Sequence, residues 1–94
     1  MNDINSVPDK QLTFVESLPL PLRALTFEND GRLPEYDFRG LAMWYESERG
    51  IICPRCANDT TKPPPYECGA VVESDFLICS DCGRITRGGE WRDE

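Results

Sequence analysis

Cysteine is the residue type in this chain best suited to chemistry, because its thiolate binds soft metal ions and reacts with electrophiles. Cys53 and Cys56 form one Cys-x-x-Cys pair, Cys79 and Cys82 form a second, and 22 residues lie between the two pairs. A short apolar segment precedes each pair. A turn of this length lets two sulfurs converge on one ion, and two such turns complete a tetrahedral Zn²⁺ site with Zn–S bonds of about 2.3 Å. The spacing therefore predicts one structural zinc ion held by these four thiolates.

Other roles for the cysteines are less favoured. Four thiolates leave no open position for water and the chain has no histidine, so a catalytic zinc is not expected. The paired cysteines could instead be small buried residues or redox thiols, but the chain lacks the length of a thioredoxin-like βαβ fold. The fifth cysteine, Cys68, is expected to be a spare thiol. A role as an alternative ligand or as a reactive thiol stays open.

The segments around the two pairs resemble the zinc-ribbon superfamily. The similarity lies in Ile-Ile-Cys-Pro-Arg-Cys at 51–56 and Phe-Leu-Ile-Cys-Ser-Asp-Cys-Gly-Arg-Ile at 76–85, and it extends over residues 51–88. It is most similar to the ribbons of transcription factors and RNA polymerase subunits. The resemblance implies an antiparallel ribbon, the four paired cysteines as ligands and a link to transcription. Two departures are Ala57, where glycine is usual, and Glu73-Ser74-Asp75, whose serine separates acids that are adjacent in cleavage-stimulating ribbons. That activity is therefore not carried over.

Length and composition limit the architecture. The chain has 94 residues, of which 39% are hydrophobic, so it can form one small unit that needs a staple such as zinc. It has no apolar run of about 18 residues and no secretion leader, so neither a membrane span nor export is expected. A cytoplasmic location is expected, and the reducing conditions there favour metal binding over disulfides.

The predicted fold class is small α+β. Residues 1–50 contain no cysteine and are expected to form a helical or mixed segment. This segment should pack on a C-terminal antiparallel zinc ribbon, residues 51–94, to form one compact unit. The best helix is predicted over residues 34–49, with Pro34 in its first turn and Gly50 as its terminator. The apolar stripe expected to face the core contains Phe38, Leu41, Ala42 and Tyr45.

Weaker local patterns predict the remaining elements. Residues 6–18 fit a short helix, but residues 12–16 fit a strand nearly as well. The run Leu18-Pro19-Leu20-Pro21-Leu22 is predicted to be an extended connector, because proline has no N–H to donate inside a helix or a central strand. Asn29-Asp30-Gly31 predicts a turn, and residues 58–65 predict a surface loop. Short strands are expected at 51–52, 69–72, 76–78 and 84–86.

Charge and residue types indicate the class of function. The formal net charge is −7, which disfavours general nucleic-acid binding and favours a partner protein with a basic surface, such as one associated with nucleic acid. No catalytic set emerges, so the chain is expected to be a non-enzymatic adaptor or inhibitor. The alternative is a transcription-linked ribbon that contacts nucleic acid or RNA polymerase through Arg84, Arg87 and Trp91. Trp44 is a further candidate partner contact, although packing in the core is an alternative role.

Overall fold

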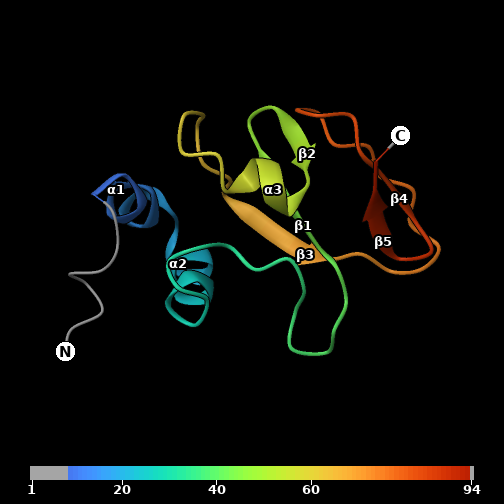
Figure 1. Ribbon diagram of the computed structural model, residues 1–94, viewed down its shortest axis with the longest axis horizontal. Helices are drawn as coiled ribbons and strands as arrows, with labels where there is room; N and C mark the ends of the chain where they lie inside the picture. Colours follow the sequence, from blue (N-terminus) through green and yellow to red (C-terminus); the bar gives the residue numbers. More distant parts are fainter. Residues whose placement is uncertain (1–8, 94) are drawn as a thin grey trace.

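The computed structural model describes residues 9–93, which form an elongated molecule of 42 × 27 × 22 Å. Figure 1 shows α1 and α2 at one end, the β4–β5 hairpin at the other and a three-stranded sheet between them. No helix within 9–93 has the length and apolar character needed to cross a membrane. In chain order the elements are α1 (Asp9–Ser17), α2 (Leu20–Phe27), β1 (Met43–Ser47), β2 (Gly50–Ile52), α3 (Pro54–Ala57), β3 (Glu67–Ala70), β4 (Ile85–Arg87) and β5 (Glu90–Arg92).

Both sheets are antiparallel, which confirms the α+β class. The larger sheet has the order β2-β1-β3, with Tyr45 of β1 opposite Ile52 of β2 and Cys68 of β3. The smaller sheet contains β4 and β5, with Thr86 opposite Trp91. Because opposed residues in a sheet share a face, Tyr45, Ile52 and Cys68 lie on the same side.

One cluster of buried side chains joins the two halves of the sequence. Val15 of α1 and Leu22 of α2 belong to the same core as Tyr45 on β1. Cys53 and Cys79, one from each cysteine pair, also belong to this core. The Tyr45 hydroxyl is satisfied inside the molecule, because it donates a 2.7 Å hydrogen bond to the carbonyl of Pro34. The cysteine pairs are therefore part of the core rather than an appendage to it.

The helix predicted over residues 34–49 is wrong. The second half of this segment is strand β1, in which Met43, Tyr45 and Ser47 are buried and the intervening side chains are half-buried. This alternation has a period of two, which suits a strand with one face on a core, and it overlaps with apolar spacings that also suit a helix. Gly40 has a φ of +85°, which ends any helical path before the strand. Phe38, assigned to the core, is 96% exposed.

The extended connector predicted at Leu18-Pro19-Leu20-Pro21-Leu22 is also corrected, because α2 begins there. Pro19 is the residue before the helix and Pro21 lies in its first turn. The N–H groups of a first turn have no partner within the helix, so proline loses nothing at these positions. The open choice over residues 6–18 resolves as helix α1 from Asp9 to Ser17, while 6–8 lie outside the described part of the chain.

The short elements after residue 28 agree in part with the sequence. The turn at Asn29-Asp30-Gly31 is confirmed, with positive φ at Asp30 and Gly31. Strand β2 contains the predicted 51–52, while β3 and β4 are displaced from the predicted 69–72 and 84–86. Residues 76–78 form no regular strand and join β4 through a bridge between Ile78 and Ile85 and a hydrogen bond from the Leu77 N–H to Oγ1 of Thr86.

Gly69 on β3 has a packing role that predicts a measurable cost of substitution. A Cβ at this position would lie 2.3 Å from Cζ2 of Trp44, which is directly opposite on β1. Gly69→Ala should therefore displace the indole, reduce the free energy of unfolding by about 1–3 kcal/mol and shift tryptophan fluorescence to the red. Glu67→Ala on the same strand should change the stability by less than about 0.5 kcal/mol. Equal urea denaturation midpoints for these two variants would contradict this packing role.

Candidate metal centre

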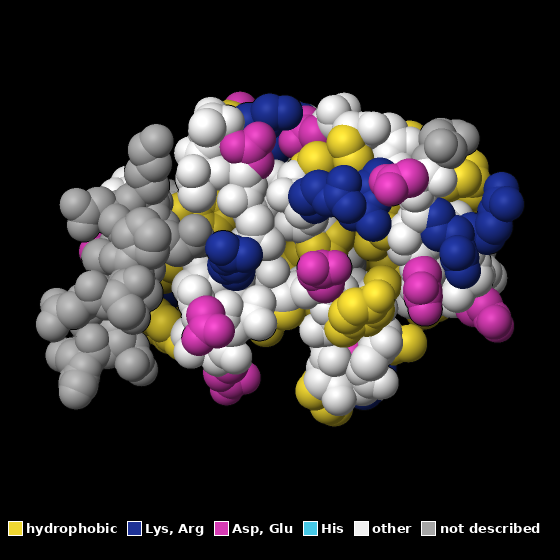
Figure 2. All heavy atoms as spheres, viewed as in Figure 1, with side chains coloured by type: hydrophobic (Ala, Val, Ile, Leu, Met, Phe, Trp, Pro, Cys, Tyr) yellow, Lys and Arg dark blue, Asp and Glu magenta, His cyan; other side chains and the backbone are white. Residues whose placement is uncertain are grey.

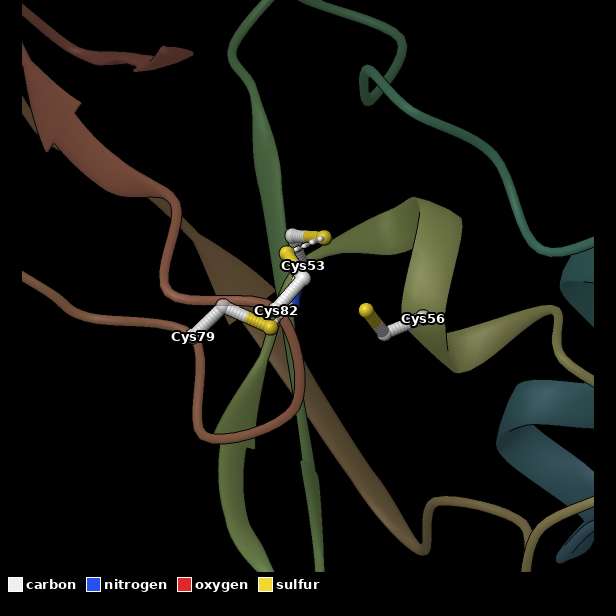
Figure 3. Close-up of side chains that lie close together, drawn as sticks. All are labelled: Cys53, Cys56, Cys79 and Cys82. Atoms are coloured by element: carbon white, nitrogen blue, oxygen red, sulfur yellow. Dashed lines mark hydrogen bonds between the residues drawn. The ribbon is translucent and has the colours of Figure 1, made fainter. Parts of the chain in front are cut away.

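The two cysteine pairs meet in one cluster. The Sγ atoms of Cys53, Cys56, Cys79 and Cys82, hereafter the cysteine cluster, all lie within 4.8 Å of one another. Figure 3 shows Cys56 on the helical turn α3 and the other three side chains around the junction of β2 with the loop before β4. The Sγ atoms of Cys53 and Cys82 are 3.7 Å apart. A tetrahedron of sulfurs around Zn²⁺ has edges of about 3.8 Å when each Zn–S bond is about 2.3 Å. The cluster therefore fits a single ion with four thiolate ligands.

Both pairs sit on turns closed in the same way. In the first turn the Ala57 N–H donates to the carbonyl of Cys53 at 2.9 Å, and in the second the Gly83 N–H donates to the carbonyl of Cys79 at 3.0 Å. Gly83 has a φ of +82°, a conformation that glycine adopts without strain. The first turn continues as α3 and ends without a positive φ. Glycine, which zinc ribbons usually have after the second cysteine of a pair, is therefore not required here, and the buried Ala57 fits.

Backbone hydrogen bonds hold the two turns against each other. The Ser80 N–H donates to the carbonyl of Ile51 at 2.9 Å, which ties the second turn to β2. The Cys53 N–H donates to Sγ of Cys79 at 3.3 Å. Because β2 places Cys53 and receives the second turn, the strand aligns both pairs. The four sulfurs are thus positioned by the fold itself, which is the arrangement a structural site requires.

The environment favours the thiolate at Cys79 more than at Cys56 or Cys82. Burial raises the pKa of the Cys56 and Cys82 thiols. Burial acts in the same direction on Cys79, but backbone N–H groups, those of Cys53, Cys82 and Asp81, point at its Sγ and lower its pKa to about 7. Hydrogen bonds from N–H groups stabilise the thiolate, the form that binds a metal ion. The fold therefore prepares Cys79 for metal binding by stabilising its thiolate.

An ion pair between Arg49 and Asp81 connects the second cysteine turn to other segments of the chain. Asp81, between the two cysteines of that turn, accepts hydrogen bonds from Nε of Arg49 at 2.9 and 3.0 Å. The Asp81 side chain is only 6% exposed, and Lys62 approaches it at 3.9 Å. Arg49 also donates to the carbonyl of Pro63 at 2.8 Å. The pair thus fastens the β1–β2 turn, the 58–65 loop and the second cysteine turn together.

This ion pair should contribute more to stability than an exposed one. Arg49→Met leaves the Asp81 carboxylate largely buried with only the more distant Lys62, and should reduce the free energy of unfolding by about 1.5–3 kcal/mol. The matched change Arg39→Met removes a pair with Asp37 in which the arginine side chain is 57% exposed, compared with 21% for Arg49. That change should cost no more than about 1 kcal/mol. Urea denaturation of both variants measures the difference, and equal losses would contradict the bracing role.

Cys68 lies apart from the cysteine cluster. It sits on β3 opposite Tyr45 and packs against the core. Burial, followed by the nearby Glu67 carboxylate, raises the pKa of the Cys68 thiol. A raised pKa lowers the fraction of thiolate, which disfavours both metal binding and nucleophilic reaction. The geometry accordingly fits a spare, packed thiol, and the cluster is complete without it.

Of the candidate partner contacts, Arg87 and Trp91 lie on the β4–β5 hairpin, Arg84 directly precedes β4, and Trp44 lies on β1. Arg84 is half-buried and pairs with Asp93 at 3.3 Å, while Nε1 of Trp91 donates to the carbonyl of Met43 at 2.9 Å. Arg87 is exposed on β4, whereas Trp44 lies across from Gly69 on the larger sheet. Figure 2 shows basic and acidic side chains interspersed at the end formed by β4 and β5.

Two features of the site were missed by reasoning from the sequence. The helical turn α3, which carries Cys56, was not predicted, although Pro54 at its first position is a common helix start. The pair between Arg49 and Asp81 was also missed, because 32 residues separate its members and no local pattern links them. Comparison with known protein families, curated proteins and solved structures finds no match to this chain.

Proposed function

We propose that this protein is a non-enzymatic zinc-binding module of the zinc-ribbon type, and that it acts by binding another protein. The proposal that the chain binds zinc rests on the cysteine cluster, whose four sulfurs lie within 4.8 Å of one another. All four ligands come from the protein, so the ion has no open position for water and acts as a structural staple. Bound zinc would supply folding energy, and the chain's own residues would make the contacts with the partner.

Charge supports a protein partner with a basic surface. The chain has a net charge of −7, and four thiolates around one Zn²⁺ add a local charge of −2. Such a surface attracts basic protein and repels the phosphates of nucleic acid. The alternative of direct nucleic-acid contact through Arg84, Arg87 and Trp91 gains no support from their positions, because Trp91 hydrogen-bonds to the core strand and Arg84 is paired. The proposed role is therefore an acidic adaptor or inhibitor, with a partner that is associated with nucleic acid.

Native mass spectrometry of the purified chain tests the metal part. The expected result is one zinc ion per chain and no bound metal after acid treatment, because protonated thiols release zinc. A chain that is folded and carries no metal would overturn the proposal. A mass that corresponds to iron or to an iron–sulfur cluster would mean that the same four cysteines bind that group and not zinc.

A further inference from the structure

Residues 76–78 lie beside β4 and form one edge of the smaller sheet. The side of this segment that faces away from β4 pairs with no other strand of the described chain. The Thr86 N–H donates to the carbonyl of Leu77 at 3.0 Å, and the Cys79 N–H donates to the carbonyl of Arg84 at 2.8 Å. These bonds pair the residues on either side of Ile78 with β4, so the N–H and C=O of Ile78 point away from β4. Within residues 9–93, no hydrogen bond reaches the backbone N–H or C=O of Phe76 or Ile78.

The side chains on this edge are apolar and exposed. Phe76 is 67% exposed and Ile78 is 55% exposed. The bridge between Ile78 and Ile85 puts these two side chains and Phe76 on one face, because residues two apart in a strand point the same way. The opposite face contains Thr86, which is buried. The exposed row is therefore the outer face of the sheet.

The other edge of the same sheet is protected and this one is not. Strand β5 carries Glu90 and Arg92, and charged side chains on an edge discourage pairing with another strand. The three residues 76–78 are Phe, Leu and Ile, with no charge and no proline. An open edge with exposed apolar side chains is the kind of surface on which an extended peptide adds as a further strand.

The charges near residues 76–78 indicate which kind of peptide segment would bind at this edge. Glu73 lies in the exposed turn immediately before the edge and, within residues 9–93, forms no ion pair with an arginine or lysine. Arg87, two residues along β4 from Ile85, is directly opposite Glu90, which offsets its charge. The net charge of the whole chain is −7. A basic residue at the end of the incoming segment would therefore meet Glu73 favourably.

We propose that residues 76–78 form a docking edge for an extended segment of a partner protein. The segment carries apolar side chains at alternate positions, which pack beside Phe76 and Ile78, and a lysine or arginine at the end that meets Glu73. Its backbone pairs with the free N–H and C=O of Ile78. This inference rests on the proposed function, because it names the surface through which the protein-binding module acts.

The test uses the full zinc-loaded chain and two labelled nine-residue peptides. Both peptides have valine at alternate positions, and one has lysines near one end where the other has glutamates. Fluorescence anisotropy should give at least about tenfold tighter binding of the lysine peptide. The neutral double variant Phe76→Ser with Ile78→Ser should weaken that binding at least about tenfold. Phe38→Ser, which removes a still more exposed ring from the loop between α2 and β1, should leave it unchanged.

A second variant tests the backbone pairing directly. Ile78→Pro removes the N–H that an added strand would use and breaks no hydrogen bond within the described chain, as proline is tolerated on edge strands. It should also weaken binding at least about tenfold. Zinc per chain, measured on each variant, separates the two proposals. Zinc retained with no peptide binding overturns the docking edge alone, while absence of zinc from the wild type overturns the proposed function.

Three other outcomes would overturn the docking edge. If the wild type and the Phe76→Ser, Ile78→Ser variant bound the peptide with equal affinity, the binding would be due to the overall charge of the chain and not to this edge. A wild-type dimer in sedimentation, abolished by the same two changes, would assign the edge to a second copy of this chain. Binding of an oligothymidylate probe that depends on Phe76 and Ile78, in place of the peptide, would assign it to nucleic acid.

Discussion

Replacing Cys79 with serine should abolish zinc binding and unfold the chain. Cys79 is buried, belongs to the core and receives the backbone N–H donors that favour its thiolate. Structural zinc contributes about 10–16 kcal/mol in small domains, and native stabilities are only about 5–15 kcal/mol. The loss of zinc binding therefore removes at least as much free energy as the folded state has in reserve, and the chain unfolds. Native mass spectrometry reports the metal and far-UV circular dichroism reports the fold.

Cys68→Ser provides the matched control, since it makes the same chemical change at a packed thiol outside the cysteine cluster. It should retain one zinc ion and lose only about 1 kcal/mol of stability. Cys82→Ser should also lose zinc, but its exposed side chain contributes little to packing. Loss of zinc from Cys68→Ser with zinc retained in Cys79→Ser would overturn the ligand assignment and reopen a role for Cys68 in metal binding.

The candidate site was more predictable from the sequence than the surrounding fold, for a physical reason. Metal ligation fixes both residue type and spacing, so two Cys-x-x-Cys turns are enough to predict a four-sulfur cluster. The fold brings those four sulfurs together. The support of the cluster was not predictable, because the ion pair of Arg49 with Asp81 depends on how distant segments fold.

The first half of the chain shows where local patterns mislead. Residues 34–49 have apolar side chains at helical spacing, yet Met43, Tyr45 and Ser47 form a strand because β2 and β3 pair with it on both sides. Pairing between segments outweighs the weak helix preference of one segment. The same limit applies to Leu18–Leu22, where the first-turn position of proline decides between an extended connector and a helix.

Removing zinc from the intact wild-type chain should unfold both halves in one transition. Val15 of α1 and Leu22 of α2 share a core with Cys53 and Cys79, so releasing the sulfurs opens the packing of α1 and α2 as well. The helices are 9 and 8 residues long, and isolated helices shorter than about 12–15 residues are marginal in water. Titration with a strong zinc chelator, under reducing conditions, should reduce the helical signal and shift tryptophan fluorescence at the same chelator concentration.

Adding back one equivalent of zinc should restore both signals, which separates metal loss from oxidation of the thiols. The measurement also tests whether residues 1–50 and 51–94 act as one unit. Helical signal that persists after zinc has left would show that the N-terminal half is stable on its own, and the shared core would then contribute little to it. A single transition would instead mean that the cysteine cluster governs the whole chain, including any partner-binding surface, since the edge at residues 76–78 leads directly into Cys79.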